Sequence, residues 1–585
     1  MRYLALAADY DGTLAHDGAV SDDLIKALEQ VAASGRKLIL VTGRELDELL
    51  DVFPQIGIFD LVVAENGALL YRPATRETKP LTEPPAEAFV RELKRRNVTP
   101  LSVGRTIVAT VEPNETIVLD VIRDLGLELH VVFNKGAVMV LPPNVNKATG
   151  LTLALEELKL SLHNVVAVGD GENDHAMLEA VEYSFAVANA VPMLKAKADR
   201  TTLRTHGEGV LELVHDLLDN DLASTPPRTL RRNVLLGTDV LGAEVMLPAA
   251  RTNLLVAGSS GSGKSTLATG VLERLAAQDY QFCIVDPEGD YEDFYDAVVF
   301  GTAQRGPSAE EVLTALEQPD VNVVVNLIGL PLEDRPTFFL GLLPRLQELR
   351  SKTGRPHWIL VDEAHHLLPR DHQLAPVVLT QKLDGMIYVT VHPDWVAPAA
   401  LQAVDVVAVL GDDPADALQR FASAAGQAAP SLEADTVAPG HALVWRRDDA
   451  RAHAFVIEIA PSRTERRRHR RKYSEGELPP ERSFFFRGPE GKLNLRAQNL
   501  ILFNQLADGV DDETWLHHLR QGDYSAWLRG CIKDDTLAEQ VVEVEQQHDL
   551  AAVESRLLVR RAIEEHYTLP ASAAESRGKS AVHQQ

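Results

Sequence analysis

The sequence contains little cysteine, no long apolar run and too few basic residues to balance its acidic ones. Its two cysteines, Cys283 and Cys531, lie far apart in 585 residues, which excludes a disulfide framework or a cysteine zinc site. No run approaches the roughly 20 apolar residues of a membrane-spanning helix. The apolar opening MRYLALAA is too short for a signal peptide, because Asp9 interrupts it. We therefore expect a reducing, cytoplasmic setting and no membrane partner.

The deficit of positive charge bears on binding partners. Lys and Arg number 58 against 85 Asp and Glu, which gives a formal net charge of −27. An acidic chain repels nucleic-acid backbones, so binding them would need a local basic concentration. One segment provides it, RTERRRHRRK at 463–472, but we favour a solvated linker there. Nucleic acid is an alternative partner and not the favoured one.

The length predicts three or four folded units. Residues 1–218 alternate short apolar runs with amphipathic segments, a pattern typical of a doubly wound parallel sheet with ligands beyond the carboxyl ends of its strands. Residues from about 72 to 145 break this rhythm with prolines and a βαβ-like insert, which we interpret as a cap. After a linker at 219–233, a second alternating series occupies residues 234–460 and ends near the strand HALVW at 441–445.

The remaining residues differ in character. A basic linker at 461–482 precedes a helical domain at 483–568, in which Trp515, Trp527 and Phe484–Phe486 should form a small core and His517 and His518 a surface pair. This domain is assigned to docking or regulation, and the tail at 569–585 is predicted to be disordered. The predicted fold class is α/β, with two doubly wound parallel-sheet domains and a small C-terminal helical domain.

The stretch AADYDGTL places two carboxylates just after the first apolar run. Because side chains alternate along a strand, Asp9 and Asp11 should point to the same side at its exit. One carboxylate there can attack a phosphorus atom, while the other protonates the leaving oxygen and then activates water. This pair predicts a catalytic site for phosphate removal.

Further polar residues follow other apolar runs or open a helix. The segment GDGEND at 169–174 offers Asp170 and Asp174, hard oxygen ligands suited to Mg²⁺. Thr42 in LVTGR and Lys147 in VNKATG can hold phosphoryl oxygens and neutralise their charge. Together these signals predict a magnesium-dependent site for a phosphate group.

Residues 1 to about 218 resemble the haloacid-dehalogenase (HAD) superfamily, in particular its Cof-type branch, and the stretch VAVGDGENDHAMLEAVEYSFAVANAVPMLKAKAD does so nearly throughout. The resemblance implies that Asp9 is the nucleophile that forms an aspartyl-phosphate and that Asp11 is the acid/base. It also implies that Thr42 and Lys147 bind phosphate. Asp170, with Asp9 and the backbone carbonyl of Asp11, is implied to hold Mg²⁺, and Asp174 to support the metal. Most members of the branch are phosphatases of small phosphorylated metabolites, often sugars, and the cap chooses the substrate.

A second motif lies about 250 residues further on, in NLLVAGSSGSGKSTLATGVLERL. An apolar strand, a glycine-rich loop and a helix let backbone amides and the helix dipole face phosphate oxygens. Lys264 should reach the outer phosphates and Ser265 should ligate Mg²⁺. The predicted nucleotide-binding residues are Gly258, Ser259, Ser260, Gly261, Ser262, Gly263, Lys264, Ser265 and Thr266.

The strand HWILVDEAHH supplies two acidic residues for this ATP site. Asp362 can bind Mg²⁺ through water, and Glu363 can polarise a water for attack, which favours hydrolysis over transfer to an acceptor. The alternative is that Glu363 only caps the next helix. Thr390 and His392, at the end of GMIYVTVH, are placed to sense the outer phosphate.

Residues 234–460 resemble HerA/FtsK-type P-loop ATPases, through VDPEGDY at 285–291 and the DEAHH strand. The resemblance implies ATP hydrolysis by Lys264, Ser265, Asp362 and Glu363, and a homo-oligomeric ring that moves nucleic acid. Two features depart from the family: no barrel precedes the P-loop, and no arginine finger is assignable. The candidates for that finger are Arg345, Arg355 and Arg370.

Three functional hypotheses follow. The favoured one is a magnesium-dependent phosphohydrolase of a small phosphorylated metabolite, a sugar phosphate or a phosphoglycolate-like ester, regulated by a fused ATP-hydrolysing domain. The alternative is a DNA-associated HerA-like ATPase or translocase with an accessory phosphatase for nucleic-acid ends or nucleotides. A kinase and phosphatase pair is disfavoured, because Glu363 indicates hydrolysis.

Overall fold

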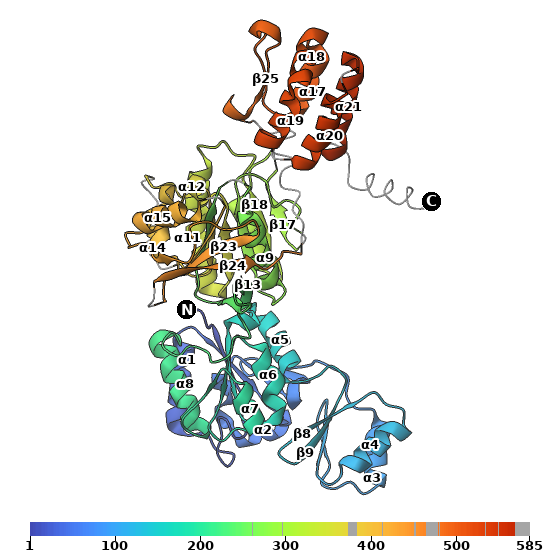
Figure 1. Ribbon diagram of the computed structural model, residues 1–585. Coiled ribbons are helices and arrows are strands. Elements are labelled where there is room, and N and C mark those ends of the chain that lie inside the picture. The colour runs from blue at the N-terminus through green and yellow to red at the C-terminus, as the bar shows by residue number, and fades with distance from the viewer. Residues whose placement is uncertain are drawn as a thin grey trace. The chain divides into compact units, whose positions relative to one another are not determined.

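The chain forms two compact units, Met1–Thr464 and Glu465–Gln585, which are described separately (Figure 1). A computed structural model describes residues 1–259, 261–294, 296–302, 304–371, 383–411, 413–449, 452–463, 478, 480–532, 534–547 and 549–567. Most of the basic segment and the predicted disordered tail lie outside these residues. Among the described helices, none combines the length and apolar character needed to cross a bilayer.

The first unit contains an eight-stranded sheet near its N-terminus, in the order β12-β11-β10-β1-β2-β3-β4-β5. The parallel strands are β12 (Arg200–Thr201), β11 (Tyr183–Ala186), β10 (Val165–Gly169), β1 (Ala5–Ala8), β2 (Lys37–Val41) and β3 (Leu61–Ala64). Two antiparallel strands, β4 (Leu69–Arg72) and β5 (Glu77–Pro80), extend one edge. Every residue of β1 and β10 is buried, as expected for strands covered on both faces.

Helices cover both faces of this sheet. Helices α1 (Asp22–Ala33) and α8 (His206–Asn220) lie together on one face, and α5 (Lys147–Leu158) and α6 (His175–Ala180) on the other (Figure 1). Ser21 caps α1 by accepting a hydrogen bond from the amide of Leu24, which satisfies an amide at the helix start. The buried side of α1 consists of leucine, alanine and valine at helical spacing.

The predicted cap forms a separate antiparallel sheet in the order β6-β7-β9-β8. Its elements are α3 (Glu87–Arg95), β6 (Ser102–Val103), β7 (Val108–Val111), α4 (Glu115–Asp124), β8 (His130–Asn134) and β9 (Ala137–Leu141). The expected βαβ-like topology is wrong, because a helix followed by two antiparallel strands occurs twice. A tight turn at Lys135 and Gly136, with φ of 48° and 84°, makes a hairpin where a parallel pair would need a crossover.

The second sheet of this unit has twelve strands, and its main path is β14-β13-β24-β23-β21-β15-β20-β19-β16-β18-β17. The parallel strands are β21 (Val406–Leu410), β15 (Leu254–Gly258), β20 (Met386–Thr390), β19 (Trp358–Val361), β16 (Phe282–Asp286), β18 (Val323–Asn326) and β17 (Val298–Phe300). The antiparallel edge consists of β13 (Val234–Asp239), β14 (Glu244–Leu247), β23 (His441–Arg446) and β24 (His453–Ile459), and β22 (Ser431–Leu432) pairs with β24. The sheet therefore continues beyond HALVW, and a hairpin of β13 and β14 precedes the P-loop, where the sequence analysis found no barrel.

The second unit is mainly helical. A hairpin of β25 (Phe484–Phe486) and β26 (Leu495–Ala497) is followed by α17 (Leu500–Gly509), α18 (Asp512–Gln521), α19 (Asp523–Trp527), the π-helical segment η8 (Leu528–Ile532), α20 (Asp535–Glu545) and α21 (Ala552–Tyr567). The small core predicted around Trp515 and Trp527 is confirmed, since both are buried with Phe484 and Phe486. His518 is not part of a surface pair: it is buried and accepts a hydrogen bond from the amide of Arg487.

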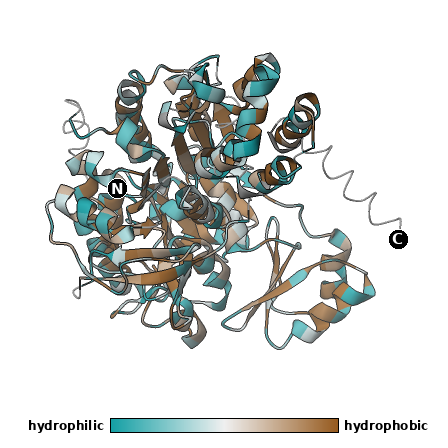
Figure 2. Ribbon diagram, turned by 45° about the horizontal axis from the view of Figure 1, so that its top comes forward, coloured by the Kyte–Doolittle hydropathy of each residue, from teal (hydrophilic) through white to brown (hydrophobic). Residues whose placement is uncertain are grey.

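The fold class predicted from the sequence is confirmed, whereas the domain boundaries stay predictions. Apolar residues are concentrated in the strands of the sheets, where Figure 2 shows the ribbon mostly brown. The two parallel sheets explain why the sequence alternates in two long series.

Candidate active site

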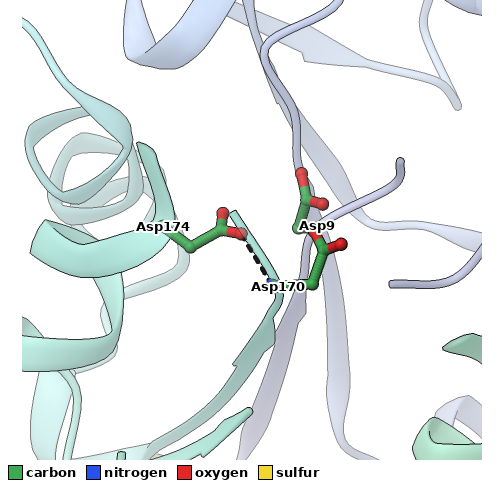
Figure 3. A group of neighbouring side chains, drawn as sticks. All are labelled: Asp9, Asp170 and Asp174. Carbon is green, nitrogen blue, oxygen red and sulfur yellow. Dashed lines mark hydrogen bonds between the residues drawn. The ribbon is translucent and has the colours of Figure 1, made fainter. Parts of the chain in front are cut away.

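Three carboxylates meet at the carboxyl edge of the first sheet (Figure 3). Asp9 follows β1, Asp170 follows the neighbouring strand β10, and Asp174 directly precedes α6 (His175–Ala180). Strands β1 and β10 are parallel and in register, so the residues after them lie side by side. One oxygen from each carboxylate lies within 4.8 Å of the others. The structure thus brings together three of the predicted metal ligands.

Lys147 lies between two of these carboxylates. Its Nζ is 2.5 Å from Asp9 Oδ1 and 2.6 Å from Asp174 Oδ1, and its side chain is 0% exposed. Lys147 is the first residue of α5, which Asn146 caps by accepting hydrogen bonds from two backbone amides. The cap fixes the start of the helix, and so it fixes where the lysine enters the site.

The electrostatics of the cluster favour a further cation. Burial, followed by the charge of Asp174, raises the pKa of Asp9 to about 8 against the opposing effect of Lys147. Burial alone would lower the pKa of Lys147, but Asp174 and Asp9 raise it above its ordinary value, so this lysine stays charged. The raised pKa of Asp9 shows that its negative charge is not fully compensated. Buried carboxylate oxygens with uncompensated charge fit Mg²⁺, which prefers oxygen ligands.

Asp11 is placed differently from the expectation. Its carboxylate accepts two hydrogen bonds from Arg44, from Nε at 2.6 Å and from Nη2 at 2.7 Å, and it does not join the cluster. Strand β1 ends at Ala8, and Gly12 with φ of 81° turns the chain. Side-chain alternation therefore stops before Asp11.

Thr42 follows β2, as predicted from the sequence. It is fully buried, and its Oγ1 accepts a hydrogen bond of 3.1 Å from the amide of Arg44. Arg44 stands in the same LVTGR motif, but sequence reasoning did not single it out. Its position two residues after Thr42 was the available signal.

Two other residues at this site were missed. Asn189 Nδ2 donates to the carbonyl of Gly12 at 2.7 Å and to Asp170 Oδ2 at 3.2 Å. Lys135, at the turn of the β8–β9 hairpin in the cap, forms an ion pair with Asp170 Oδ2. No sequence pattern indicates Lys135, because the cap folds back onto the core from a distant part of the chain.

The P-loop between β15 and α9 (Lys264–Ala276) forms the second site. Gly258, Gly261 and Gly263 have φ of 148°, 80° and 97°, values that L side chains rarely adopt. A Cβ on Gly258 would lie 2.1 Å from the carbonyl oxygen of Leu410, so this position requires glycine. Ser260 lies outside the described residues.

The polar groups of the loop fit a bound polyphosphate. Lys264 opens α9 and its Nζ donates to the carbonyl of Ser259 at 2.9 Å. The buried hydroxyls of Ser262 and Ser265 have no hydrogen-bond partner among the described residues, and Thr266 is exposed in the first turn of α9. Loop amides, a lysine and unpartnered hydroxyls are the groups that bind phosphates and their Mg²⁺.

Two acidic residues, Asp362 and Glu363, follow β19, which is separated in the sheet from β15, the strand before the P-loop, by β20 alone. Asp362 is fully buried. Glu363 has φ of 42° and occupies the position before α12 (Ala364–Leu367), but its side chain makes no capping hydrogen bond. The capping alternative therefore fails, and strained backbone of this kind is often kept at functional sites.

A histidine joins these residues to the end of β20, which lies between β15 and β19. His365 Nδ1 is 3.0 Å from Thr390 Oγ1 and 3.5 Å from a carboxylate oxygen of Glu363. Burial, followed by the charges of His366 and His392, lowers the pKa of His365 to about 3, so it is neutral at physiological pH. Sequence reasoning noted Thr390 and His392 but not His365.

The three candidate arginine fingers lie in different surroundings. Arg355 is fully buried and its Nη2 donates to the carbonyl of Lys159 at 2.8 Å, so it is not available to a neighbouring copy. Arg345 pairs with Glu310 at 2.8 Å on the surface. The amide of Arg370 donates to the carbonyl of Trp395.

Comparison with known proteins also separates the part of the chain with the carboxylate cluster from the part with the P-loop. A family model described as haloacid dehalogenase-like hydrolase matches residues 6–116 and 107–214, and one described as AAA domain matches residues 249–387. A phosphoglycolate phosphatase of Methanothermobacter thermautotrophicus is 34% identical over 219 residues, which are 36% of this chain and 96% of that protein. Phosphoglycolate phosphatase 2 of Saccharolobus solfataricus is 28% identical over 227 residues, 37% of this chain and 94% of that protein.

Among solved structures, a haloacid dehalogenase-like hydrolase from Bacteroides thetaiotaomicron is 20% identical, with a TM-score of 0.33 over 37% of this chain and 99% of that chain. The two phosphoglycolate phosphatases match along nearly their whole length, so they have no room for a counterpart of the P-loop domain. Through its N-terminal third, which carries the carboxylate cluster, the chain belongs to the haloacid dehalogenase-like hydrolases.

Proposed function

We propose that the N-terminal domain is a magnesium-dependent phosphatase of a small phosphorylated metabolite, of the phosphoglycolate type. The observation that carries the proposal is the buried contact of Lys147 with Asp9 and Asp174, next to Asp170. The names of the similar proteins support the substrate class. Sugar phosphates are the other class that the resemblance implied.

In the proposed reaction, Asp9 attacks the phosphorus atom and the ester oxygen leaves with a proton from the carboxyl group of Asp11. Asp11 then takes a proton from water, whose oxygen attacks the aspartyl-phosphate and releases phosphate. Lys147 neutralises phosphoryl oxygens from inside the protein. Mg²⁺, held by Asp9 and Asp170 with the support of Asp174, would supply further positive charge. Asp11 must turn away from Arg44 for this role.

For the second domain we propose ATP hydrolysis. Lys264 and Ser265 bind the phosphates and Mg²⁺, Asp362 supports the metal, and Glu363 polarises the attacking water. The position of Glu363 directly after Asp362, just beyond the end of β19, supports the role of a base. A HerA/FtsK-type ATPase with a homo-oligomeric ring is the finer proposal, supported by the DPEGDY and DEAHH segments.

We further propose that the nucleotide state regulates the phosphatase through a buried contact within the first unit. The carboxylate of Glu182 accepts hydrogen bonds from Arg2 and from the hydroxyl of Tyr280, the latter at 2.7 Å, and lies 2.7 Å from His163 Nδ1. The His163 ring stacks on Tyr280 with centroids 3.7 Å apart. Although burial opposes it, Arg2 and His163 hold the pKa of Glu182 well below its usual range, so Glu182 is charged.

The position of this contact supports a route between the two sites through the strands of the sheets. Arg2 and His163 lie before β1 and β10, whose far ends lead to Asp9 and Asp170, and Tyr280 lies before β16, a strand of the sheet that carries the P-loop. The two sheets therefore meet at the amino ends of their strands, and each active site lies at the opposite, carboxyl end. We therefore propose that regulation acts through the strands and not by direct transfer of phosphate between the sites.

Phosphate release from 2-phosphoglycolate, measured with Mg²⁺ and with or without a non-hydrolysable ATP analogue, tests these proposals. Asp9→Asn should abolish this release and keep ATP hydrolysis, and Lys264→Ala should do the converse. Loss of both activities in either variant would contradict two independent sites. Tyr280→Phe keeps the stacked ring and removes one hydrogen bond, so it should weaken the effect of the analogue without abolishing either activity. An analogue without effect on the wild type contradicts regulation.

A further inference from the structure

The tip of the β8–β9 hairpin in the cap lies against the catalytic loops. Lys135 occupies the turn with φ of 48°, and its ammonium group forms an ion pair with Asp170. A Cβ on Gly171 would lie 2.5 Å from Asn134 Oδ1, and one on Gly12 would lie 2.8 Å from Lys135 Nζ. Both core loops therefore have glycine where side chains of the hairpin approach.

Two lysines thus reach the carboxylate cluster from different depths. Lys147 comes from the core and is 0% exposed, whereas the side chain of Lys135 comes from the cap and is 45% exposed. A phosphoryl group on Asp9 lies next to the inner lysine, and the remainder of the substrate has to extend toward the cap and solvent. The outer lysine is the cation that the cap presents to this remainder, whereas Arg44 belongs to the core and contacts Asp11.

The contact of Lys135 with Asp170 is one that substrate binding can exchange. Asp170 Oδ2 also accepts a hydrogen bond from Asn189, so it keeps a partner if the lysine turns away. A half-exposed ammonium on a four-carbon stem can turn toward a neighbouring anion at small cost. A carboxylate is the anion that a short phosphate ester can carry there.

On the basis of the proposed phosphatase function, we propose that Lys135 is a specificity residue that binds a carboxylate on the leaving group. The substrate class is then a short phosphate monoester of a hydroxy acid, and a neutral sugar phosphate is disfavoured. Lys135 takes no part in the chemistry at phosphorus. Its contribution is an ion pair with the part of the substrate that departs.

The test compares 2-phosphoglycolate with 2-phosphoglycolamide, in which an uncharged amide replaces the carboxylate at the same size. Steady-state phosphate release is measured for full-length wild type, Lys135→Met, Lys135→Arg and the control Lys94→Met. Lys94 lies exposed on α3 of the same cap. Lys135→Met should raise KM for 2-phosphoglycolate by roughly 10- to 100-fold, as expected for one lost charged hydrogen bond. KM for the amide should stay within about threefold, Lys135→Arg should recover much of the loss, and the control should match wild type.

Other outcomes overturn the inference in ways that can be told apart. Equal losses on both substrates would mean that Lys135 serves the phosphoryl group or the metal. A wild type that hydrolyses the amide as well as the acid would show that no carboxylate is recognised, although the phosphatase function would stand. A wild type that releases phosphate from neither ester, nor from p-nitrophenyl phosphate, would refute the proposed function itself.

Discussion

Replacement of Lys147 by methionine tests whether this lysine holds the carboxylate cluster together. The lysine is fully buried and contacts Asp9 and Asp174 at 2.5 and 2.6 Å, with Asp170 close by. Methionine has a similar volume and no charge, so the substitution removes the cation and leaves little cavity. Three carboxylates would then face one another in a buried site without their inner counter-charge.

The expected cost follows from this burial. Loss of one partner of a buried ion pair destabilises proteins by about 3–5 kcal/mol, because a charge is left uncompensated. For a domain of about 200 residues this corresponds to a fall in Tm of roughly 10 °C. Lys79→Met is a matched control, since Lys79 is 65% exposed and pairs with Glu157. An exposed pair of this kind contributes less than about 1 kcal/mol.

The assay is thermal unfolding of the full chain in EDTA, followed by the same scan with Mg²⁺. We expect Lys147→Met to melt well below wild type in EDTA, and the double variant Lys147→Met/Asp174→Asn to recover part of the loss by removing one of the opposed charges. Mg²⁺ should also reduce the difference in Tm between Lys147→Met and wild type, because it supplies positive charge to the same carboxylates. If Lys147→Met melts within 2 °C of wild type in EDTA, the electrostatic account of this cluster is wrong.

Three further predictions concern other parts of the chain. Gly258→Ala should abolish binding of a fluorescent ATP analogue, because its Cβ would lie 2.1 Å from the Leu410 carbonyl; the control Gly341→Ala, in the open on α11 (Arg335–Thr353), should bind normally. Burial, followed by the charges of Asp290 and Asp362, raises the pKa of Asp286 from 3.8 to about 7. Protonated Asp286 therefore stabilises the folded state fully below pH 4, and this contribution, at most about 4 kcal/mol, is lost as the pH rises through 7. From pH 5 to pH 8 in EDTA, the Tm of wild type should therefore fall more than the Tm of Asp286→Asn. Equal falls in the two proteins would contradict this prediction. Burial raises the pKa of the Cys283 thiol to about 12, so a thiol reagent at pH 8 should modify Cys531 and leave Cys283 unreacted until the protein is denatured; rapid reaction at Cys283 would show that β16 is more accessible than described.

The sequence predicts those parts of the sites that depend on local order along the chain. Asp9 and Asp170 each follow a buried strand, and parallel neighbouring strands bring their carboxyl ends together, so the cluster could be expected. The P-loop is a continuous strand, loop and helix, and its glycines occur where positive φ values are needed. In both cases a short segment contains the whole signal.

The parts that were missed depend on contacts between distant segments. Lys135 reaches Asp170 from a cap whose hairpin topology was not recognised. Arg44 contacts the carboxylate of Asp11 because β1 ends at Ala8 and the chain turns at Gly12, which side-chain alternation does not reveal. The contact of Glu182 with Tyr280 joins two residues from different domains that are 98 positions apart in sequence, and neither stands in a motif.

The function proposed for the N-terminal domain depends on Asp9 as the nucleophile of a magnesium-dependent phosphatase. The most direct test is mass spectrometry of full-length protein quenched in acid during turnover of 2-phosphoglycolate with Mg²⁺. Reduction with borohydride then converts an aspartyl-phosphate to homoserine, which marks the modified residue. The account predicts homoserine at position 9 in wild type and none in a sample that lacks Mg²⁺. Phosphate release at full rate with position 9 unmodified, or with the Asp9→Asn variant, would contradict it.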